Sequence, residues 1–261
     1  MNASSVAGDL ENVRAFVTGG SSGLGRAMAH ALVHAGARVA VSSRYEQRAR
    51  AAADELGPGA VGVPLDVQDV ESVSAAIDAV YETLGGIDLL VNNAGIGMRF
   101  VNPRFMTEPQ PFWKVSDTGF REVVTTKLVG TFLVSQAVVP RMLADGSGRI
   151  VTVSMSETTM TRRGFAPYGP SGAAVEALAR VMAADLEGTP LTANILLPGG
   201  ATATGMVPDE IDEEARARLL DPAIMGPPIV WLASAAAAGV HDERIVARSF
   251  AAWLNARGQK A

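Results

Sequence analysis

Short apolar segments alternate with longer alanine-rich segments along most of this chain, and the alternation limits the folds that it can adopt. Strands buried on both faces read as near-continuous apolar runs, so the short segments are typical of a parallel sheet covered by helices. The longer segments leave room for right-handed helical crossovers. Strands are expected at 14–18, 38–42, 61–65, 88–92, 149–154 and 192–197, and helices near 23–35, 45–56, 69–84, 118–143 and 170–187.

The pattern predicts a single α/β domain over residues 1–261, with one doubly wound parallel sheet of about seven strands and helices on both faces. Hydrophobic residues make up 48% of the chain, which is enough for one large core. Two inserts, at about 96–116 and 198–228, interrupt the alternation. Long irregular inserts in compact domains often cover active sites, so both are expected on the substrate side.

Composition argues against several classes of partner. The net charge is −5 and the longest basic run is two residues, which does not favour nucleic acid. The absence of cysteine excludes disulfides and thiolate metal sites, and the three histidines lack metal-ligand spacing, so no metal is expected. No apolar run reaches the roughly 18 residues that would cross a bilayer, so we expect no membrane association and a cytoplasmic location.

A glycine-rich segment, TGGSSGLG at 18–25, follows the first predicted strand and opens the first predicted helix. Glycines in this frame allow a tight turn and a close approach of the backbone to a pyrophosphate, which the free N–H groups of the helix N-terminus then bind. The segment therefore predicts a dinucleotide-binding Rossmann fold. Its expected cofactor-binding residues are Gly19, Ser21, Ser22, Gly23, Leu24 and Gly25.

The end of the second strand indicates which dinucleotide is bound. An acidic residue there would bind the ribose 2′-hydroxyl of NAD, but Ser43 holds that place and Arg44 follows. A hydroxyl and a guanidinium suit a 2′-phosphate, so we predict NADP, with NAD as the alternative. Asp66 and Val67, at the end of the third strand, are expected beside the adenine, where Asp66 either caps its own loop or accepts the amino group.

Three motifs in order, TGGSSGLG, NNAG at 92–95 and YGPSGAAVEAL at 168–178, resemble the short-chain dehydrogenase/reductase family. The resemblance extends from about residue 12 to about 246. It implies hydride transfer between NAD(P) and the alcohol or carbonyl group of a small molecule, with Tyr168 as the general acid in reduction and the base in oxidation. It further implies that Asn93, Ala94, Gly95, Pro198 and Gly199 lie beside the cofactor.

The chain departs from the family at three active-site positions. The lysine that usually follows the tyrosine by four residues is Gly172, the usual asparagine is Lys127, and the usual serine is Met155. In the family, the asparagine and lysine positions face one small volume. We therefore hypothesise that Lys127 places its ammonium in the gap left at Gly172 and lowers the pKa of Tyr168, which is about 10 when unperturbed. Lysine at 172 with asparagine at 127 should then restore activity.

A serine hydroxyl is still expected to orient the substrate oxygen. Ser154 and Ser156 flank Met155 and share one side of an extended chain. A one-residue change in loop length would present Ser156, which we take as the donor, with Ser154 as the second choice.

Other interpretations stay open. In one alternative, Lys127 points to solvent. In another, the protein binds a dinucleotide without turnover, as a sensor, an inert subunit or a deliberately disabled variant. Non-redox lyase chemistry on the same scaffold is a third possibility. The apolar residues of the two inserts predict a mostly apolar substrate pocket, and those on the two long helices predict a homodimer or homotetramer. The first set is Phe100, Phe105, Met106, Phe112, Trp113, Met206 and Val207, and the second includes Met142, Leu143 and Val181.

Overall fold

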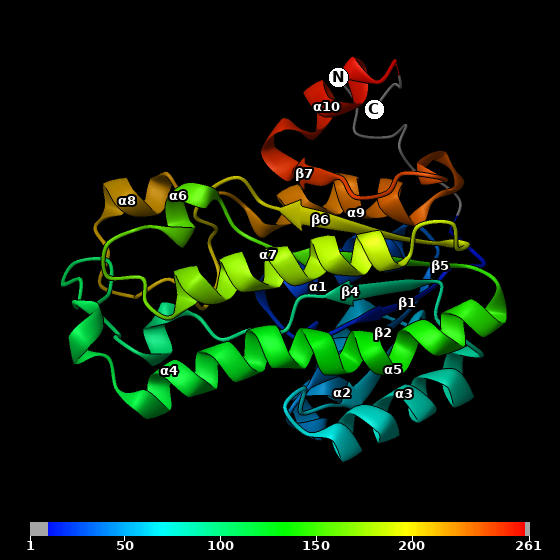
Figure 1. Ribbon diagram of the computed structural model, residues 1–261, viewed down its shortest axis with the longest axis horizontal. Helices are drawn as coiled ribbons and strands as arrows, with labels where there is room; N and C mark the ends of the chain where they lie inside the picture. Colours follow the sequence, from blue (N-terminus) through cyan, green and yellow to red (C-terminus); the bar gives the residue numbers. More distant parts are fainter. Residues whose placement is uncertain (1–9, 259–261) are drawn as a thin grey trace.

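The computed structural model describes residues 10–258, which form three layers around one parallel sheet (Figure 1). The two ends of the predicted domain, residues 1–9 and 259–261, lie outside the described residues. The strands pair in the order β3-β2-β1-β4-β5-β6-β7, which confirms the predicted doubly wound sheet. The strands are β1 (Arg14–Val17), β2 (Arg38–Ser43), β3 (Ala60–Pro64), β4 (Leu89–Asn92), β5 (Gly148–Val153), β6 (Leu191–Leu197) and β7 (Arg244–Val246).

Helices cover both faces of the sheet. In the view of Figure 1, α3, α5 and α7 lie in front of the strands, and α1, α2 and α9 lie behind them. The long helices are α1 (Gly23–His34), α2 (Glu46–Leu56), α3 (Val70–Leu84), α4 (Asp117–Val124), α5 (Gly130–Asp145), α7 (Tyr168–Asp185) and α9 (Gly226–Ala233). The shorter ones are α6 (Glu157–Met160), α8 (Glu213–Ala217) and α10 (Phe250–Ala256), with 3-10 turns η1 (Met98–Phe100), η2 (Phe112–Lys114) and η4 (Pro222–Met225).

The apolar strand residues divide between two cores because successive side chains point to opposite faces. In β1, Ala15 and Val17 join the cluster with α1 and α9, whereas Phe16 joins the cluster with α3 and α5. All three side chains are fully buried. Continuous apolar runs were therefore the correct signal for strands covered on both sides.

The predicted helix at 118–143 is longer than expected and is not regular. Ser116 begins it by accepting a hydrogen bond from the Gly119 amide (3.1 Å), and Gly146 ends it with φ +78°. A π-helical turn, η3 (Thr125–Val129), separates α4 from α5. By length and composition alone the run Asp117–Asp145 is long and apolar enough to span a membrane, but it packs against α3, α7 and the central strands.

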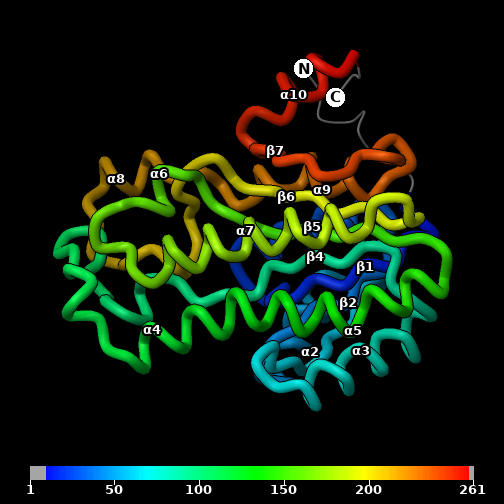
Figure 2. The backbone as a smooth tube through the Cα atoms, viewed as in Figure 1, coloured from blue at the N-terminus to red at the C-terminus, as the bar shows by residue number. Residues whose placement is uncertain are grey.

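Both predicted inserts lie at one end of the molecule, past the carboxyl ends of the strands (Figure 2). The first contains η1 and η2, and the second contains α8 and η4. They contact each other directly, since Arg99 pairs with Asp209 (2.5 Å) and donates to the Val207 carbonyl (3.3 Å). This end of the fold is thus covered by two segments that are over a hundred residues apart in sequence.

A seventh strand and a short helix follow α9 in the described chain. Ile245 lies in β7, and the tail then becomes α10, whose Trp253 stacks on Phe250 and packs edge-to-face against Trp231 of α9. The tail packs on α9 of its own chain, and just before α10 the Arg248 amide donates to the Pro198 carbonyl (3.2 Å) at the start of the second insert. In Figure 1, α10 lies beyond β7 at the edge of the sheet.

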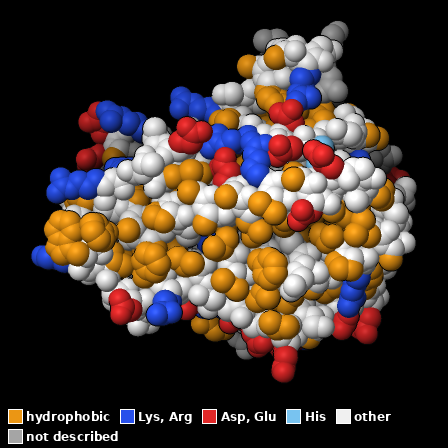
Figure 3. Space-filling model, in the orientation of Figure 1, with side chains coloured by type: hydrophobic (Ala, Val, Ile, Leu, Met, Phe, Trp, Pro, Cys, Tyr) orange, Lys and Arg blue, Asp and Glu red, His pale blue; other side chains and the backbone are white. Residues whose placement is uncertain are grey.

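Apolar side chains spread over the exposed face of the two long helices (Figure 3). Phe132 and Leu143 of α5 and Val181 of α7 are between 41% and 56% exposed. The placement of Met142 on this face was wrong, because its side chain is fully buried and packs beside Gly148. The predicted homodimer or homotetramer stays a prediction.

Candidate active site

The glycine turn is packed so closely that no side chain fits inside it. Gly19 and Gly23 have φ of +62° and +55°, a region that glycine adopts without strain. A Cβ built on Gly25 would lie 2.4 Å from Asn93 Nδ2 and 2.6 Å from the Gly19 carbonyl oxygen. The close approach leaves the N-terminus of α1 open toward the end of the sheet, where Ser22 is the N-cap residue and makes no side-chain cap.

The NNAG segment locks this turn to the end of β4. Thr18 Oγ1 accepts hydrogen bonds from the amides of Asn93 (3.0 Å) and Ala94 (3.1 Å). Asn93 Nδ2 in return donates to the carbonyls of Thr18 (2.9 Å) and Gly19 (3.2 Å). Because β1 and β4 are the strands at which the sheet order reverses, the turn sits at the switch point where dinucleotides bind.

The residues expected at the adenine and its ribose lie around one acidic side chain. Arg44 pairs with Glu122 at 3.6 Å and is about half exposed. Glu122 also accepts from Gln68 Nε2 (2.9 Å). Asp66 Oδ1 accepts from the Gln68 amide (3.0 Å) and so caps its own loop, while its contact with the adenine amino group stays a prediction. The Ser43 hydroxyl accepts from the Tyr45 amide (3.3 Å).

Tyr168 and Lys127 meet at the carboxyl end of the sheet. Lys127 lies on the π-helical turn, is only 9% exposed, and places Nζ over the Tyr168 ring, 5.0 Å from the ring centroid. Within residues 10–258 its ammonium makes no hydrogen bond and no ion pair. Lys127 therefore does not point to solvent, and the two side chains form a cation–π pair beside the expected nicotinamide site.

The electrostatics of this pair differ from the expectation. Burial raises the pKa of Tyr168, whereas the hypothesis required a lower pKa, and burial lowers the pKa of Lys127 to about 8. Burial removes water from the charged form of each group, the tyrosinate and the ammonium, and so favours the neutral form of each. In the ligand-free protein the tyrosine thus holds its proton firmly and suits an acid more than a base.

The two candidate serines have different partners. Ser154 is buried and donates to Glu176 Oε2 (2.7 Å), so its hydroxyl is already engaged. Ser156 is the N-cap of α6, where its Oγ accepts from the Thr159 amide (3.3 Å) and lies 2.8 Å from Thr159 Oγ1. Ser156 is the more exposed of the two, and it precedes a helix of only one turn.

The gap that we expected beside Gly172 is filled. A Cβ built on Gly172 would lie 2.5 Å from Met155 Cε and 2.8 Å from its Sδ. The Met155 side chain is buried and occupies that space, so the ammonium of Lys127 approaches Tyr168 from the ring face instead. The sequence did not predict this contact, although Met155 and Gly172 both depart from the active-site residues that are usual in the resembled family.

The family model described as short chain dehydrogenase matches residues 13–215, more than half of the chain. The chain belongs to this family. Short chain dehydrogenases are oxidoreductases that use NAD or NADP, and the seven-stranded sheet with its glycine turn agrees with that assignment.

Named relatives of this short chain dehydrogenase match nearly its whole length. It is 32% identical to a 3-oxoacyl-[acyl-carrier-protein] reductase of Vibrio harveyi, over 91% of this chain and 96% of that protein. A solved 3-ketoacyl-(acyl-carrier-protein) reductase of Brucella melitensis, complexed with NADH, has TM-score 0.80 and 27% identity, covering 91% of this chain and 97% of that one. A putative NAD(P) dependent gluconate 5-dehydrogenase of Beutenbergia cavernae, with bound NADP, has TM-score 0.80 and 32% identity over 94% and 98%.

The insert residues near Tyr168 divide into buried and exposed sets. Phe105 and Phe165 pack edge-to-face with centroids 5.4 Å apart, and Tyr168 and Met106 pack against the same cluster. Other predicted pocket residues are surface side chains: Phe112 and Trp113 are each 71% exposed. The apolar surroundings of Tyr168 therefore come from Phe105 and its neighbours.

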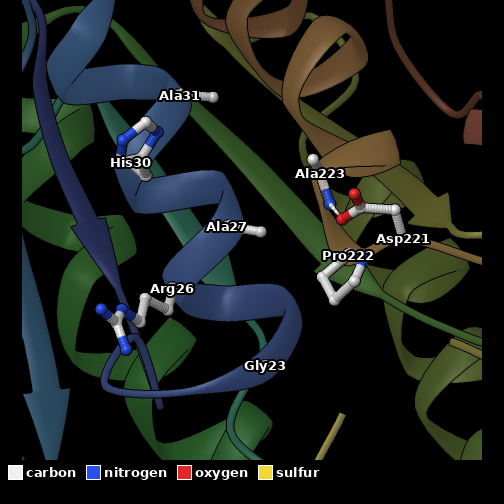
Figure 4. A pocket seen from close by; sticks show the side chains of 8 residues that line it. All are labelled: Gly23, Arg26, Ala27, His30, Ala31, Asp221, Pro222 and Ala223. Carbon is white, nitrogen blue, oxygen red and sulfur yellow. Dashed lines mark hydrogen bonds between the residues drawn. The ribbon is translucent and has the colours of Figure 1, made fainter. Parts of the chain in front are cut away.

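A groove of about 340 Å³ lies between α1 and η4, with Gly23 at one end (Figure 4). Ala27 and Ala31 point across it toward Pro222, and Asp221 turns back to accept from the Ala223 amide (2.8 Å). The groove contains neither Tyr168 nor Lys127 in its lining. It is a seam between α1 and η4, separate from the pair of Tyr168 and Lys127.

Proposed function

We propose that the protein is an NADP-dependent carbonyl reductase, reversible as an alcohol dehydrogenase, in which Tyr168 donates the proton. The observation that supports this most strongly is the pair formed by buried Lys127 and partly buried Tyr168, 5.0 Å from ammonium to ring centroid, at the switch-point end of the sheet. A general acid and a cation meet there although the family's usual lysine is absent.

The residues around the glycine turn fit a dinucleotide. The space that a Cβ would fill at Gly25 is taken by protein, which holds the turn in a shape that exposes backbone N–H groups at the start of α1. The residues from Gly19 to Gly25 would hold the pyrophosphate, and Asn93 to Gly95, with Pro198 and Gly199, would flank the nicotinamide. The cofactor supplies hydride to the carbonyl carbon.

The protein's own groups handle the proton and the charge. Tyr168 keeps its proton because burial raises its pKa, and its hydroxyl makes no hydrogen bond within residues 10–258, so it is available to a substrate oxygen. As that proton leaves, the Lys127 ammonium stabilises the tyrosinate from the ring face. Ser156 is our candidate to orient the carbonyl.

A few residues bear on the choice of cofactor and substrate. Arg44 supports NADP because its guanidinium is half exposed and held only by a 3.6 Å pair with Glu122, which a 2′-phosphate can replace. Buried Phe105 and partly buried Met106 next to Tyr168 favour an apolar group beside the reacting carbon. Since several relatives are named as 3-oxoacyl-[acyl-carrier-protein] reductases, 3-oxoacyl thioesters are the first substrates to test.

A dinucleotide-binding protein without turnover is the second candidate. It is favoured by Met155, which puts a thioether where the family has a hydroxyl. The cytoplasmic location stays a prediction under either function.

Consumption of NADPH separates the two. The purified protein is assayed with acetoacetyl thioesters and with apolar ketones, beside Tyr168→Phe as the matched variant that retains the ring. A reductase should lose turnover by about 10²–10⁴-fold in Tyr168→Phe while NADPH binding is kept, because only the proton donor is removed. NADPH binding with no turnover in either protein would establish the binder instead.

A further inference from the structure

Met155 fills the position from which most of this family draws its cation. Its Cε, Sδ and Cγ would lie 2.5, 2.8 and 3.1 Å from a Cβ at Gly172. The terminal methyl alone can rotate away from such a contact, but the Cγ belongs to the inner part of the side chain. Met155 is also only 6% exposed, so it has little room to withdraw. A side chain at 172 therefore requires the methionine to repack.

The strand end at Ser154 and Met155 is linked to α7 through Glu176, directly and by way of Arg244. Before it, Ser154 donates to Glu176 Oε2 (2.7 Å). At Met155 itself, the carbonyl accepts from Arg244 Nη2 (3.1 Å), and Arg244 forms a partly buried ion pair with the same Glu176. The strand end thus cannot move away from α7 without breaking these bonds.

One face of α7 carries three successive positions with three different partners. Tyr168, Gly172 and Glu176 are spaced four residues apart and so stack along one side of the helix. Tyr168 meets the ammonium of Lys127, Gly172 meets the thioether of Met155, and Glu176 meets Ser154 and Arg244. The volume below the tyrosine is apolar, and the cation comes from the π-helical turn instead.

We propose that Met155 is a positioning residue that decides which helix supplies the active-site cation. While Met155 occupies the space beside Gly172, a lysine at 172 cannot reach under Tyr168, and Lys127 is the cation that the site can use. This rests on the proposed function. It predicts that lysine at 172 with asparagine at 127 does not restore activity by itself, because position 155 has to change with them.

A stability measurement tests the packing without any assay of activity. Gly172→Ala should lower the melting temperature in the native background, because overpacking outweighs the helical preference for alanine. In the Met155→Ala background the same change should raise it, because the space is then free. Each shift should be about 2–4 °C for a domain of this size. The same shift in both backgrounds would overturn the proposed contact.

Activity variants test the choice of cation. Starting from Lys127→Asn, adding Gly172→Lys should restore little turnover, whereas adding Gly172→Lys with Met155→Ala should raise kcat at least tenfold. The matched control replaces Met155→Ala by Met155→Leu, which keeps the bulk and should not restore. NADPH binding by each variant reports that it is folded.

The pH profile separates a moved cation from a repacked core. In the native protein, kcat for reduction should fall as the pH rises through about 8, where Lys127 loses its charge. In the restored triple variant this limb should move to a different pH. Full rescue by Gly172→Lys with Met155 intact would overturn the proposal. If no protein turns over at all, the proposed function fails, and the melting temperatures alone decide the role of Met155.

Discussion

The two halves of the active site are built in different ways. At the ends of β1 and β4, the glycine turn is formed by backbone atoms, and Thr18 and Asn93 bond that backbone on both sides. At the ends of β5 and α7, the chemistry depends on side chains, and three of the family's four positions carry other residues. Only Tyr168 remains there.

This difference shows which half of the site can accept amino-acid substitutions. A backbone cradle has no side chain to exchange, and a Cβ at Gly19 or Gly25 would meet backbone atoms at 3.0 or 2.6 Å. A positive charge near a tyrosine acts over several ångströms and can come from any helix that reaches the ring. Lys127 reaches it from the π-helical turn, and such turns are frequent at functional sites.

The largest effect should come from breaking the backbone half. In Gly25→Ala the new Cβ meets Asn93 Nδ2 at 2.4 Å and the Gly19 carbonyl at 2.6 Å, so the turn has to open. Overpacking of about 2–3 kcal/mol should weaken NADPH binding by about 30–140-fold, measured by fluorescence titration. The matched control is Gly205→Ala, where nothing lies within 4 Å of the added Cβ. Unchanged affinity in Gly25→Ala would remove the contrast between the halves.

The second effect is the loss of folding stability that results from burying the Lys127 ammonium. Burial lowers the pKa of Lys127 from 10.5 to about 8, so the unfolded chain binds more protons between these values and stability should rise with pH across that window. Below pH 8 the buried ammonium is destabilising, and Lys127→Met should add about 1–3 kcal/mol to the free energy of unfolding.

Urea unfolding at pH 7, 8.5 and 10 checks this, and the gain from Lys127→Met should shrink toward zero as the pH approaches 10.5. Exposed Lys114 provides the control, since Lys114→Met should show no such pH dependence. A gain that is the same at every pH would mean that the ammonium is hydrated in solution.

The third effect separates the two serines. Ser154→Ala should cost about 1–2 kcal/mol of stability, because it leaves Glu176 Oε2 without its donor. Ser156→Ala removes only the cap of a one-turn helix, at about 1 kcal/mol, but should lower turnover about tenfold or more. Comparison of kcat with the unfolding free energy for both variants distinguishes them. A normal kcat in Ser156→Ala would withdraw that residue from the site.

The smallest effect is on the choice of cofactor. Arg44→Asp should weaken NADPH binding about tenfold more than NADH binding, since only NADPH carries the 2′-phosphate. Glu122→Gln is the reverse variant: it releases Arg44 from its 3.6 Å pair and should tighten NADPH modestly. Equal losses of both cofactors in Arg44→Asp would take Arg44 out of the binding site.

Much of the fold was predictable because each element is encoded locally. The apolar runs placed six of the seven strands to within about a residue or two, and turn glycines set the connections between them. The short strand β7 was not located, since its three residues hardly differ from a loop. The predicted helix at 118–143 missed its π-helical turn for a similar reason, because no local pattern marks one.

The sequence by itself determined the sheet, the glycine turn, the place of Tyr168 and the list of departures at 127, 155 and 172. Periodicity and glycine spacing are local properties, and the pattern of motifs follows from them. Only the tertiary structure decided how the departures fit together. Which side chain fills the space beside Gly172 depends on packing between a strand end and a helix, and the structure gives that space to Met155 and the ring face of Tyr168 to Lys127.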